Sequence, residues 1–208
     1  MRPDTLFCRK VCRQAAFRLR RRRATATAAL EPLRFAYADP PYPGLAKKYY
    51  SHEKSFAGEV DHRELIAKLE GGGYAGWALS TSWEALQDVL ALCPRGVRVM
   101  PWVKPLAPDP KALGPTCRSE ALIVRGGRML AGARVLDYLI AAPARLSGEP
   151  KLTGRKPLKF IAWLFDVLGM QLGDELDDLF PGTGIVARSW AELSRVLPRQ
   201  GDLRSESE

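Results

Sequence analysis

Short apolar runs alternate with amphipathic segments along most of the chain, and this alternation constrains the fold more than any other feature. Apolar runs bounded by Gly or Pro predict strands, and apolar side chains three and four residues apart predict helices. The predicted strands span residues 34–39, 74–79, 97–103, 121–125 and 176–180. The predicted helices span residues 61–70, 82–92, 157–168 and 185–196, while residues 135–141 are ambiguous. Because strands joined through helices pair in parallel, the sequence predicts an α/β domain with a mostly parallel sheet of about five strands, covered by helices.

Composition and charge place this domain between two tails. Hydrophobic residues make up 46% and charged residues 26% of the chain, which excludes collagen-like, coiled-coil and wholly disordered proteins. The net charge of +9 lies almost entirely in residues 1–30, which hold nine basic residues and one acidic residue, whereas the rest holds 23 and 22. We expect residues 1–32 to form a basic, disordered arm, 33–197 the folded domain and 198–208 a disordered tail. The arm either tracks nucleic-acid phosphates or is a solvated leader.

Cysteine usage and apolar segments bear on metal binding and on the compartment. Cys8, Cys12, Cys93 and Cys117 form no Cys-x-x-Cys pair and have no histidine at zinc-ligand spacing, so we expect no structural metal. No segment approaches the roughly 18 apolar residues that span a bilayer, so we expect no membrane association. Without a recognisable signal peptide, we expect reduced cysteines and a cytoplasmic protein. An organellar transit peptide is the alternative interpretation of the Arg-rich arm.

The tetrapeptide Asp39-Pro40-Pro41-Tyr42 lies at the carboxyl end of the first predicted strand, where open α/β sheets place their ligand sites. The Asp39 carboxylate offers hydrogen-bond acceptors, the prolines leave carbonyls free because they lack an N–H, and Tyr42 offers a ring for stacking. These groups suit an exocyclic amine on a planar ring. Acceptors that hold this amine steer its lone pair out of conjugation and make it a better nucleophile. A plain turn that ends a strand is the alternative interpretation.

A second turn, spanning residues 178–184 with the sequence Asp-Leu-Phe-Pro-Gly-Thr-Gly, joins a predicted strand to a predicted helix. Glycines there allow a tight turn and a close approach of the backbone to a ligand at the helix N-terminus. Ordinary strand-to-helix connections also use glycine, so this turn alone is weak evidence. Neither G-x-x-x-x-G-K-[ST] nor G-x-G-x-x-G occurs, which disfavours a nucleoside triphosphate or NAD as the ligand.

With both segments considered, the chain resembles the S-adenosylmethionine-dependent DNA adenine-N6 methyltransferases. The catalytic motif of that family, Asp-Pro-Pro-Tyr, matches residues 39–42, and its cofactor motif, Asp-x-Phe-x-Gly-x-Gly, matches residues 178–184. Lys156-Pro157 is similar to the family's Lys-Pro element, and residues 102–105, Trp-Val-Lys-Pro, are a further match. The catalytic motif comes first, which is the permuted order of one subclass and resembles small phage or bacterial enzymes.

The resemblance implies a Rossmann-like methyltransferase fold and a direct transfer of a methyl group from S-adenosylmethionine (SAM) to adenine N6 in DNA. Asp39 and the Pro40 carbonyl would hold the amine, Pro41 belongs to the same catalytic motif, and Tyr42 would stack on a base flipped out of the duplex. The cofactor residues that the resemblance implies are Lys156, Pro157, Asp178, Phe180, Gly182 and Gly184.

Two departures from the family's pattern bear on these expectations. Only about a dozen residues follow Val196, so a further strand with a ribose-binding acid has no counterpart, and the sheet would be truncated with the cofactor strand near an edge. About 30 residues separate Arg125 from Lys156, too few for the family's usual target-recognition domain. Three alternatives therefore stay open: methylation of RNA adenine, methylation of cytosine N4, and a non-catalytic subunit that binds nucleic acid.

Other residues are assigned to ordinary structural roles. Aromatic and apolar side chains at helical spacing are expected in the core, together with two further tryptophans: Phe160, Trp163, Leu164, Phe165, Trp77 and Trp83. His62 is expected at the surface, in the first turn of a helix. Three acidic residues are interpreted as solvated charge rather than metal ligands: Asp174, Glu175 and Asp177. His52 belongs to a predicted loop over residues 43–60, which we interpret as an ordinary surface loop.

Overall fold

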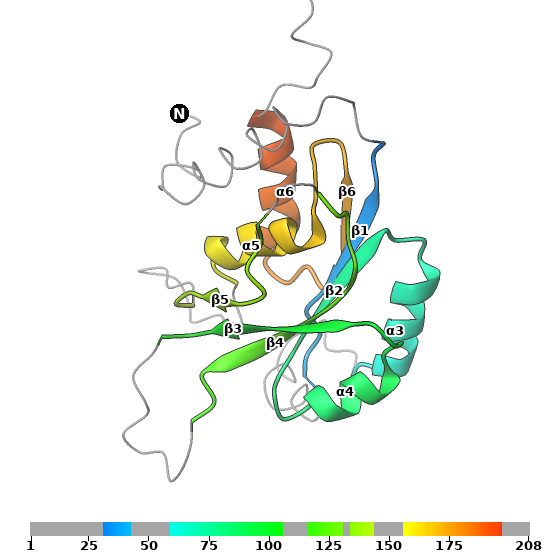
Figure 1. The fold of residues 1–208 in the computed structure, drawn as a ribbon, viewed down its shortest axis with the longest axis vertical. Helices are drawn as coiled ribbons and strands as arrows, with labels where there is room; N and C mark the ends of the chain where they lie inside the picture. Colours follow the sequence, from blue (N-terminus) through cyan, green and yellow to red (C-terminus); the bar gives the residue numbers. More distant parts are fainter. Residues whose placement is uncertain (1–30, 43–58, 106–115, 131–133, 144–155, 197–208) are drawn as a thin grey trace, which may run out of the picture.

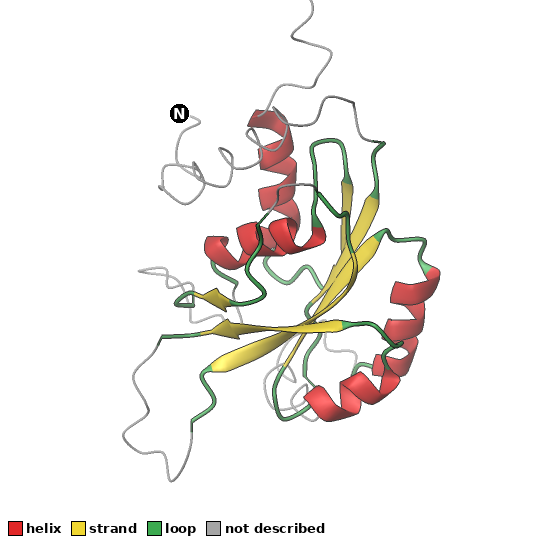
Figure 2. Ribbon diagram, in the orientation of Figure 1, coloured by secondary structure: helices red, strands yellow, loops and turns green. Residues whose placement is uncertain are grey.

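Six strands form one sheet with helices on both faces in the computed structural model, which describes residues 31–42, 59–105, 116–130, 134–143 and 156–196 (Figures 1 and 2). The strands are β1 (Arg34–Ala38), β2 (Gly76–Thr81), β3 (Arg98–Val103), β4 (Ser119–Gly126), β5 (Leu139–Ile140) and β6 (Glu175–Asp178). The helices are α3 (His62–Gly71), α4 (Leu86–Leu92), α5 (Leu158–Leu168) and α6 (Ile185–Val196). Residues 1–30 of the predicted arm, the predicted tail and His52 lie outside the described residues.

The strands lie in the order β5-β3-β4-β2-β1-β6, and the sheet contains both parallel and antiparallel pairs. β1 lies between β2 and β6 and is parallel to both, and β5 is parallel to β3. β4 is antiparallel to β2 and to β3. The α/β prediction is confirmed, although the sheet has six strands rather than about five, because the ambiguous stretch supplies β5. The connection from β3 to β4 is rich in proline, which disfavours a crossover helix, and strands joined without one commonly pair antiparallel.

Two apolar clusters lie on opposite faces of the sheet. Successive side chains of β1 alternate between them, as strand geometry requires: Phe35 and Tyr37 join one cluster, and Ala36 and Ala38 join the other. The first cluster packs against α5 and α6, and the second packs against α3 and α4. The predicted core positions on α5, and Trp77 on β2, are confirmed as buried. The carboxyl end of β1 therefore emerges between two helical layers (Figure 2).

Local sequence signals fix the helix ends. The Asp61 carboxylate accepts hydrogen bonds from the backbone N–H groups of Arg63 (2.8 Å) and Glu64 (3.1 Å), which caps the start of α3. Gly169 ends α5 with φ of 68°, a left-handed conformation that favours glycine. A side chain at Gly169 would also collide with the backbone oxygen of Arg128. Both helices thus begin and end close to the predicted residues.

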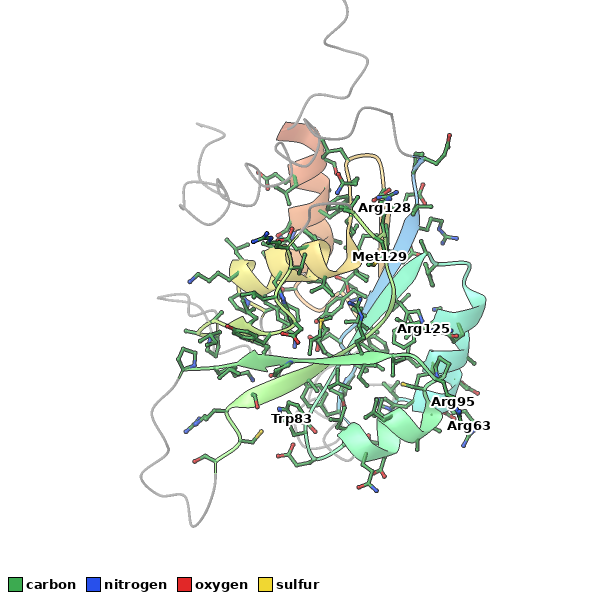
Figure 3. The ribbon with its side chains drawn as sticks, viewed as in Figure 1. Arg63, Trp83, Arg95, Arg125, Arg128 and Met129 are labelled. Atoms are coloured by element: carbon green, nitrogen blue, oxygen red, sulfur yellow. The ribbon has the colours of Figure 1, made fainter. Side chains whose placement is uncertain are left out.

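Two predictions about burial are wrong, that of His62 at the surface and that of Trp83 in the core. His62 is buried, because it shares the inward face of α3 with Leu65, Ile66 and Leu69, and its Nδ1 lies 3.0 Å from the Val60 carbonyl oxygen. Trp83 is 37% exposed (Figure 3). It lies in a turn rather than in α4, because the Ser82 hydroxyl accepts a hydrogen bond from Ala85 N–H and the helix begins only at Leu86.

The prediction that Asp174 is solvated is also wrong, since its side chain is only 1% exposed. Its carboxylate accepts hydrogen bonds from the Arg128 guanidinium and from the backbone N–H groups of Leu33 (2.8 Å) and Gln171 (2.6 Å). These partners lie before β1, after β4 and after α5. Asp174 therefore joins three distant segments at the amino end of the β1–β6 pair.

None of the helices in the described part of the chain is both long enough and apolar enough to cross a lipid bilayer.

Candidate active site

The two chemically distinctive segments leave the sheet side by side. β1 and β6 are parallel neighbours with Tyr37 opposite Asp178, and the Leu179 N–H donates a 2.9 Å hydrogen bond to the Tyr37 carbonyl. Residues 39–42 and residues 179–184 therefore follow the carboxyl ends of adjacent strands, at one edge of the sheet. The sequence separates these segments by about 140 residues, and the fold brings them together.

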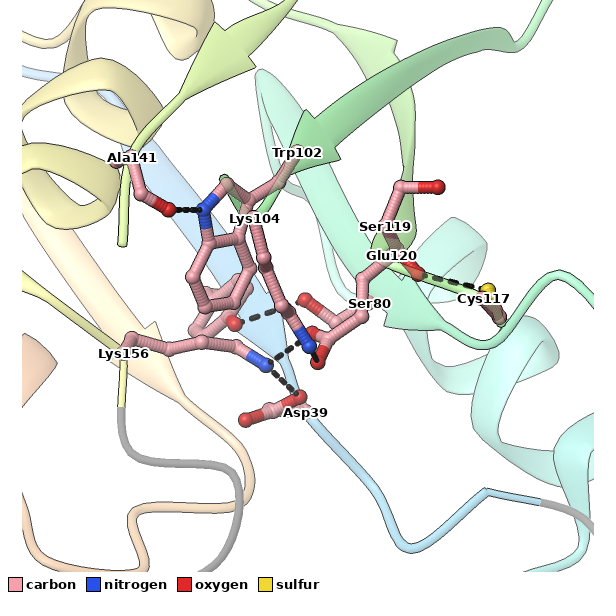
Figure 4. A network of polar contacts seen from close by, with 10 residues as sticks. Asp39, Ser80, Trp102, Lys104, Cys117, Ser119, Glu120, Ala141 and Lys156 are labelled. Carbon is pink, nitrogen blue, oxygen red and sulfur yellow. Dashed lines mark hydrogen bonds and ion pairs between the residues drawn. The ribbon is translucent and has the colours of Figure 1, made fainter. Parts of the chain in front are cut away.

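Asp39 lies at one end of a network of charged side chains (Figure 4). Lys156, which precedes α5, donates a 2.8 Å hydrogen bond from Nζ to Asp39 Oδ1. The Lys156 side chain is 3% exposed, whereas that of Asp39 is 23% exposed. The predicted cofactor residue Lys156 thus makes a direct contact with the predicted catalytic carboxylate.

Glu120, at the start of β4, extends the network on the other side of Lys156. Its Oε2 accepts a 3.0 Å hydrogen bond from Lys156 Nζ, and its Oε1 pairs with Lys104, which follows β3. The side chain of Glu120 is 12% exposed. Two ammonium groups and two carboxylates alternate, so each buried charge has a partner of opposite sign.

Aromatic side chains support the two ammonium groups. Lys156 Nζ lies 5.5 Å from the ring centroids of both Trp102 and Phe160, and Lys104 Nζ lies 4.8 Å from that of Trp102. The Trp102 indole N–H donates a 2.8 Å hydrogen bond to the Ala141 carbonyl, which fixes the ring. Ring faces attract cations, so these contacts help to hold both ammonium groups in place.

Burial and charge act in opposite directions on the network. Burial raises the pKa of Asp39, and the Lys156 ammonium offsets part of that rise. Burial alone would also raise the pKa of Glu120, but Lys156 and Lys104 together lower it below its ordinary value. Burial alone would lower the pKa of Lys156, yet the surrounding acidic groups, with Asp39 the strongest, raise it well above its ordinary value. Glu120 and Lys156 are therefore both charged at neutral pH.

Two tyrosines flank the network. The Tyr37 hydroxyl lies 2.9 Å from Ser80 Oγ, and burial raises the pKa of Tyr37 well above its ordinary value. Burial likewise raises the pKa of Tyr42, and the negative charges of Asp39 and Glu120 raise it further. Both phenols are neutral at physiological pH, and Tyr42 remains partly exposed. Pro40 is buried between Asp39 and the partly exposed Pro41.

The second segment holds a buried carboxylate without an ordinary partner. Both oxygens of Asp178 are buried, and neither makes a hydrogen bond of ordinary geometry within the described part of the chain. Burial raises the pKa of Asp178, the backbone N–H groups of Phe180 and Ala187 lower it in part, and the negative charge of Asp39 raises it further. An unsatisfied buried acceptor of this kind fits a ligand that brings a hydrogen-bond donor or a positive charge.

Glycines shape the turn between β6 and α6. Gly182 and Gly184 have φ of 48° and 68°, values that other residues adopt only with strain. A side chain at Gly182 would meet no atom within 4 Å, so its conformation, not its packing, requires glycine. Phe180, before the turn, packs partly against the α3–α4 cluster, and Pro157 precedes the first residue of α5.

Sequence reasoning missed several members of the site. Glu120 and Ser80 each lie within a strand and have no neighbouring motif, so no local signal identifies them. Lys104 lies in a stretch that resembles a family element, but its pairing with Glu120 is a property of the sheet. Among the described residues, no group of three His, Cys, Asp or Glu side chains is arranged to hold a metal ion.

Comparisons with known proteins agree with this architecture. No family model matches the sequence, and no curated protein matches it. Solved structures do match. One of them, the crystal structure of the M1.HpyAVI–SAM complex, aligns with a TM-score of 0.51 and 14% sequence identity over 88% of this chain and 85% of that one. The chain has a Rossmann-like methyltransferase fold. This confirms the fold that the family resemblance implies.

Proposed function

We propose that this chain transfers a methyl group from SAM to the exocyclic N6 of adenine in DNA. The observation that carries the proposal is the adjacency of β1 and β6. It places an Asp-Pro-Pro-Tyr segment and a glycine-rich turn with an unsatisfied carboxylate at one sheet edge. The likeness of the fold to that of a SAM complex supports the same interpretation.

The residues of the second segment fit SAM. Asp178 offers two buried acceptors that suit an ammonium group, and the positive φ of Gly182 and Gly184 bends the backbone beside them. Phe180 follows Asp178 in the same turn, and Lys156-Pro157 is the further element proposed for cofactor contact. When bound, SAM supplies an electrophilic methyl group on a positively charged sulfur.

The residues of the first segment fit the amine of adenine. The Asp39 carboxylate and the Pro40 carbonyl accept hydrogen bonds from the two amine hydrogens, and this leaves the nitrogen lone pair directed away from the ring. Tyr42 contributes a neutral, partly exposed ring on which the base stacks. Taking a base out of duplex DNA costs a few kcal/mol. Stacking on an aromatic side chain contributes roughly 1–3 kcal/mol per base and offsets part of that cost.

A transfer assay tests this proposal. The intact chain is incubated with tritiated SAM and adenine-containing duplex DNA, and labelled nucleosides are then separated. Label in N6-methyl-2′-deoxyadenosine from DNA supports the proposal. Label in N4-methylcytosine, or in adenine only when RNA is supplied, would instead support one of the two alternative substrates.

One observation favours the non-catalytic alternative. β6 is the last strand in the sheet order, so no strand lies beyond it in the described residues to carry an acid for the cofactor ribose. Calorimetric titration with SAM separates the two functions, because a subunit that only binds nucleic acid would release no heat of cofactor binding.

A further inference from the structure

We propose that Lys156 is a positioning residue that holds the Asp39 carboxylate in the orientation needed to accept the substrate amine, with Glu120 as its second counter-charge. This inference rests on the proposed function and adds residues from two other elements to it. It assigns Glu120 a part in the site that no sequence motif indicates, and it gives Lys104, from a stretch that resembles a family element, a defined partner.

The first reason is the cost of placing an ammonium group here. Lys156 is 3% exposed, and burying a charge is expensive unless it is paired and hydrogen-bonded. An apolar side chain of similar length would fill the space beside Trp102 and Phe160 without that cost. A lysine at this place is therefore better explained by what its charge does than by packing.

The second reason is the geometry at Asp39. Within the described residues, the contacts of its carboxylate run through Oδ1 to Lys156 (Figure 4). A carboxylate held by one oxygen cannot rotate freely, which leaves Oδ2 for a donor on the ligand. Fixing a reacting group in this way lowers the entropic cost of reaching the reactive arrangement.

The third reason is the balance of charge. If Lys156 faced Asp39 alone, the ammonium would neutralise the carboxylate and weaken it as an acceptor. Glu120 Oε2 shares the same Nζ at 3.0 Å, and Lys104 pairs with the other oxygen of Glu120. The four groups together carry no net charge, and Asp39 keeps part of its negative charge for the amine. Together with burial, the negative charge of Glu120 also raises the pKa of Tyr42, so the same network helps to keep the stacking ring neutral.

Two variants with opposite expected effects test the inference. Lys156→Met removes the cation that lowers the pKa of Asp39, so that pKa should rise. The acid limb of the plot of kcat against pH should therefore move to higher pH. Glu120→Gln removes an anion that raises the pKa of Asp39, so the limb should move to lower pH. The other titratable groups around Asp39 are Lys104, Tyr37, Tyr42 and Asp178, and they are the same in both variants.

The sizes of the effects are also predicted. In Lys156→Met, kcat should fall about 100-fold, because a misplaced reacting group costs about that much, and this loss should exceed any loss of SAM affinity that follows from the proposed cofactor contact. Lys156→Arg should restore part of kcat because it keeps the charge. Lys159→Met, an exposed lysine on α5, is the matched control and should leave kcat unchanged.

Carboxyl NMR titration of Asp39 in the same variants reports its pKa without relying on turnover, including in any variant whose activity is too low to measure. The inference is supported if the wild-type chain transfers methyl groups and the pKa of Asp39 shifts in opposite directions in Lys156→Met and Glu120→Gln. Unmoved Asp39 titration, unchanged kcat in Lys156→Met, or a loss of SAM affinity that matches the loss of kcat would overturn it while leaving the proposed function intact. Absence of methyl transfer by the wild-type chain would overturn the proposed function itself, and the positioning role with it.

Discussion

Replacing Asp174 with alanine should destabilise the fold strongly, because this buried carboxylate joins three segments. It accepts two hydrogen bonds from the Arg128 guanidinium and one each from the Leu33 and Gln171 backbone N–H groups. Its side chain is 1% exposed and that of Arg128 is 9% exposed. Removing the carboxylate leaves the guanidinium buried, with the Glu31 and Gly169 carbonyl oxygens and the face of the Phe35 ring as its remaining partners among the described residues.

The expected magnitude follows from these contacts. Breaking a buried ion pair by removing one partner costs about 3–5 kcal/mol, and the remaining carbonyl partners of Arg128 place this case near the lower end, about 3 kcal/mol. Asp177→Ala is the matched control. Asp177 is 38% exposed, pairs with the half-exposed Arg34 and accepts a 2.8 Å hydrogen bond from the Tyr74 hydroxyl, so its loss should cost only about 1 kcal/mol.

Urea denaturation at pH 7 measures both variants. The cost of Asp174→Ala should be almost unchanged in high salt, because buried pairs are screened little, whereas the smaller cost of Asp177→Ala should diminish. A free energy of unfolding for Asp174→Ala within about 1 kcal/mol of wild type, or equal losses in the two variants, would refute the reasoning.

Three further predictions concern the site. Glu120 has a lowered pKa in the fold, so its ionised form stabilises the protein above the unfolded value of about 4.3, and that contribution is lost as pH falls through the folded value. The stability difference between wild type and Glu120→Gln, followed by urea denaturation, should therefore shrink below about pH 4, and a constant difference would contradict the assignment. Gly182→Ala should cost about 1–2 kcal/mol and weaken SAM binding, because φ of 48° is strained for alanine, whereas Gly71→Ala, at the end of α3 with open space around it, should be neutral or stabilising. Equal stabilities of these two variants would argue against a conformational requirement at the turn. Tyr42→Ala should raise the KM for DNA about tenfold or more through lost stacking, and Tyr42→Phe should raise it less, so similar effects of both would point to the hydroxyl instead.

Local patterns predicted the parts of this fold that depend on local physics. The period of apolar residues located α5 and α6, and Asp61 and Gly169 marked helix ends because caps act within a few residues. The direction of β4 and the pairing of β5 were not predictable in this way, since they depend on contacts between distant segments. His62 could have been placed in the core, because it continues the spacing of Leu65, Ile66 and Leu69.

The site divides in the same way. Asp39 to Tyr42 and Asp178 to Gly184 are consecutive residues, so the sequence displays them directly. Glu120 enters the site only because β4 lies beside β2 and turns its first residues toward Lys156. A single glutamate at the start of a strand has many explanations, and only the three-dimensional arrangement selects one.

The most direct test of the account is mass analysis of DNA nucleosides after incubation of the full chain with SAM that carries a trideuterated methyl group. We predict N6-methyl-2′-deoxyadenosine with the deuterium label after incubation with the wild-type chain. We predict none with Asp39→Ala, although that variant still binds SAM in a calorimetric titration. Two results would contradict the claim that the ends of β1 and β6 form one methyl-transfer site. One is DNA whose adenine stays unlabelled although the wild-type chain binds SAM, and the other is equal labelling of DNA by Asp39→Ala.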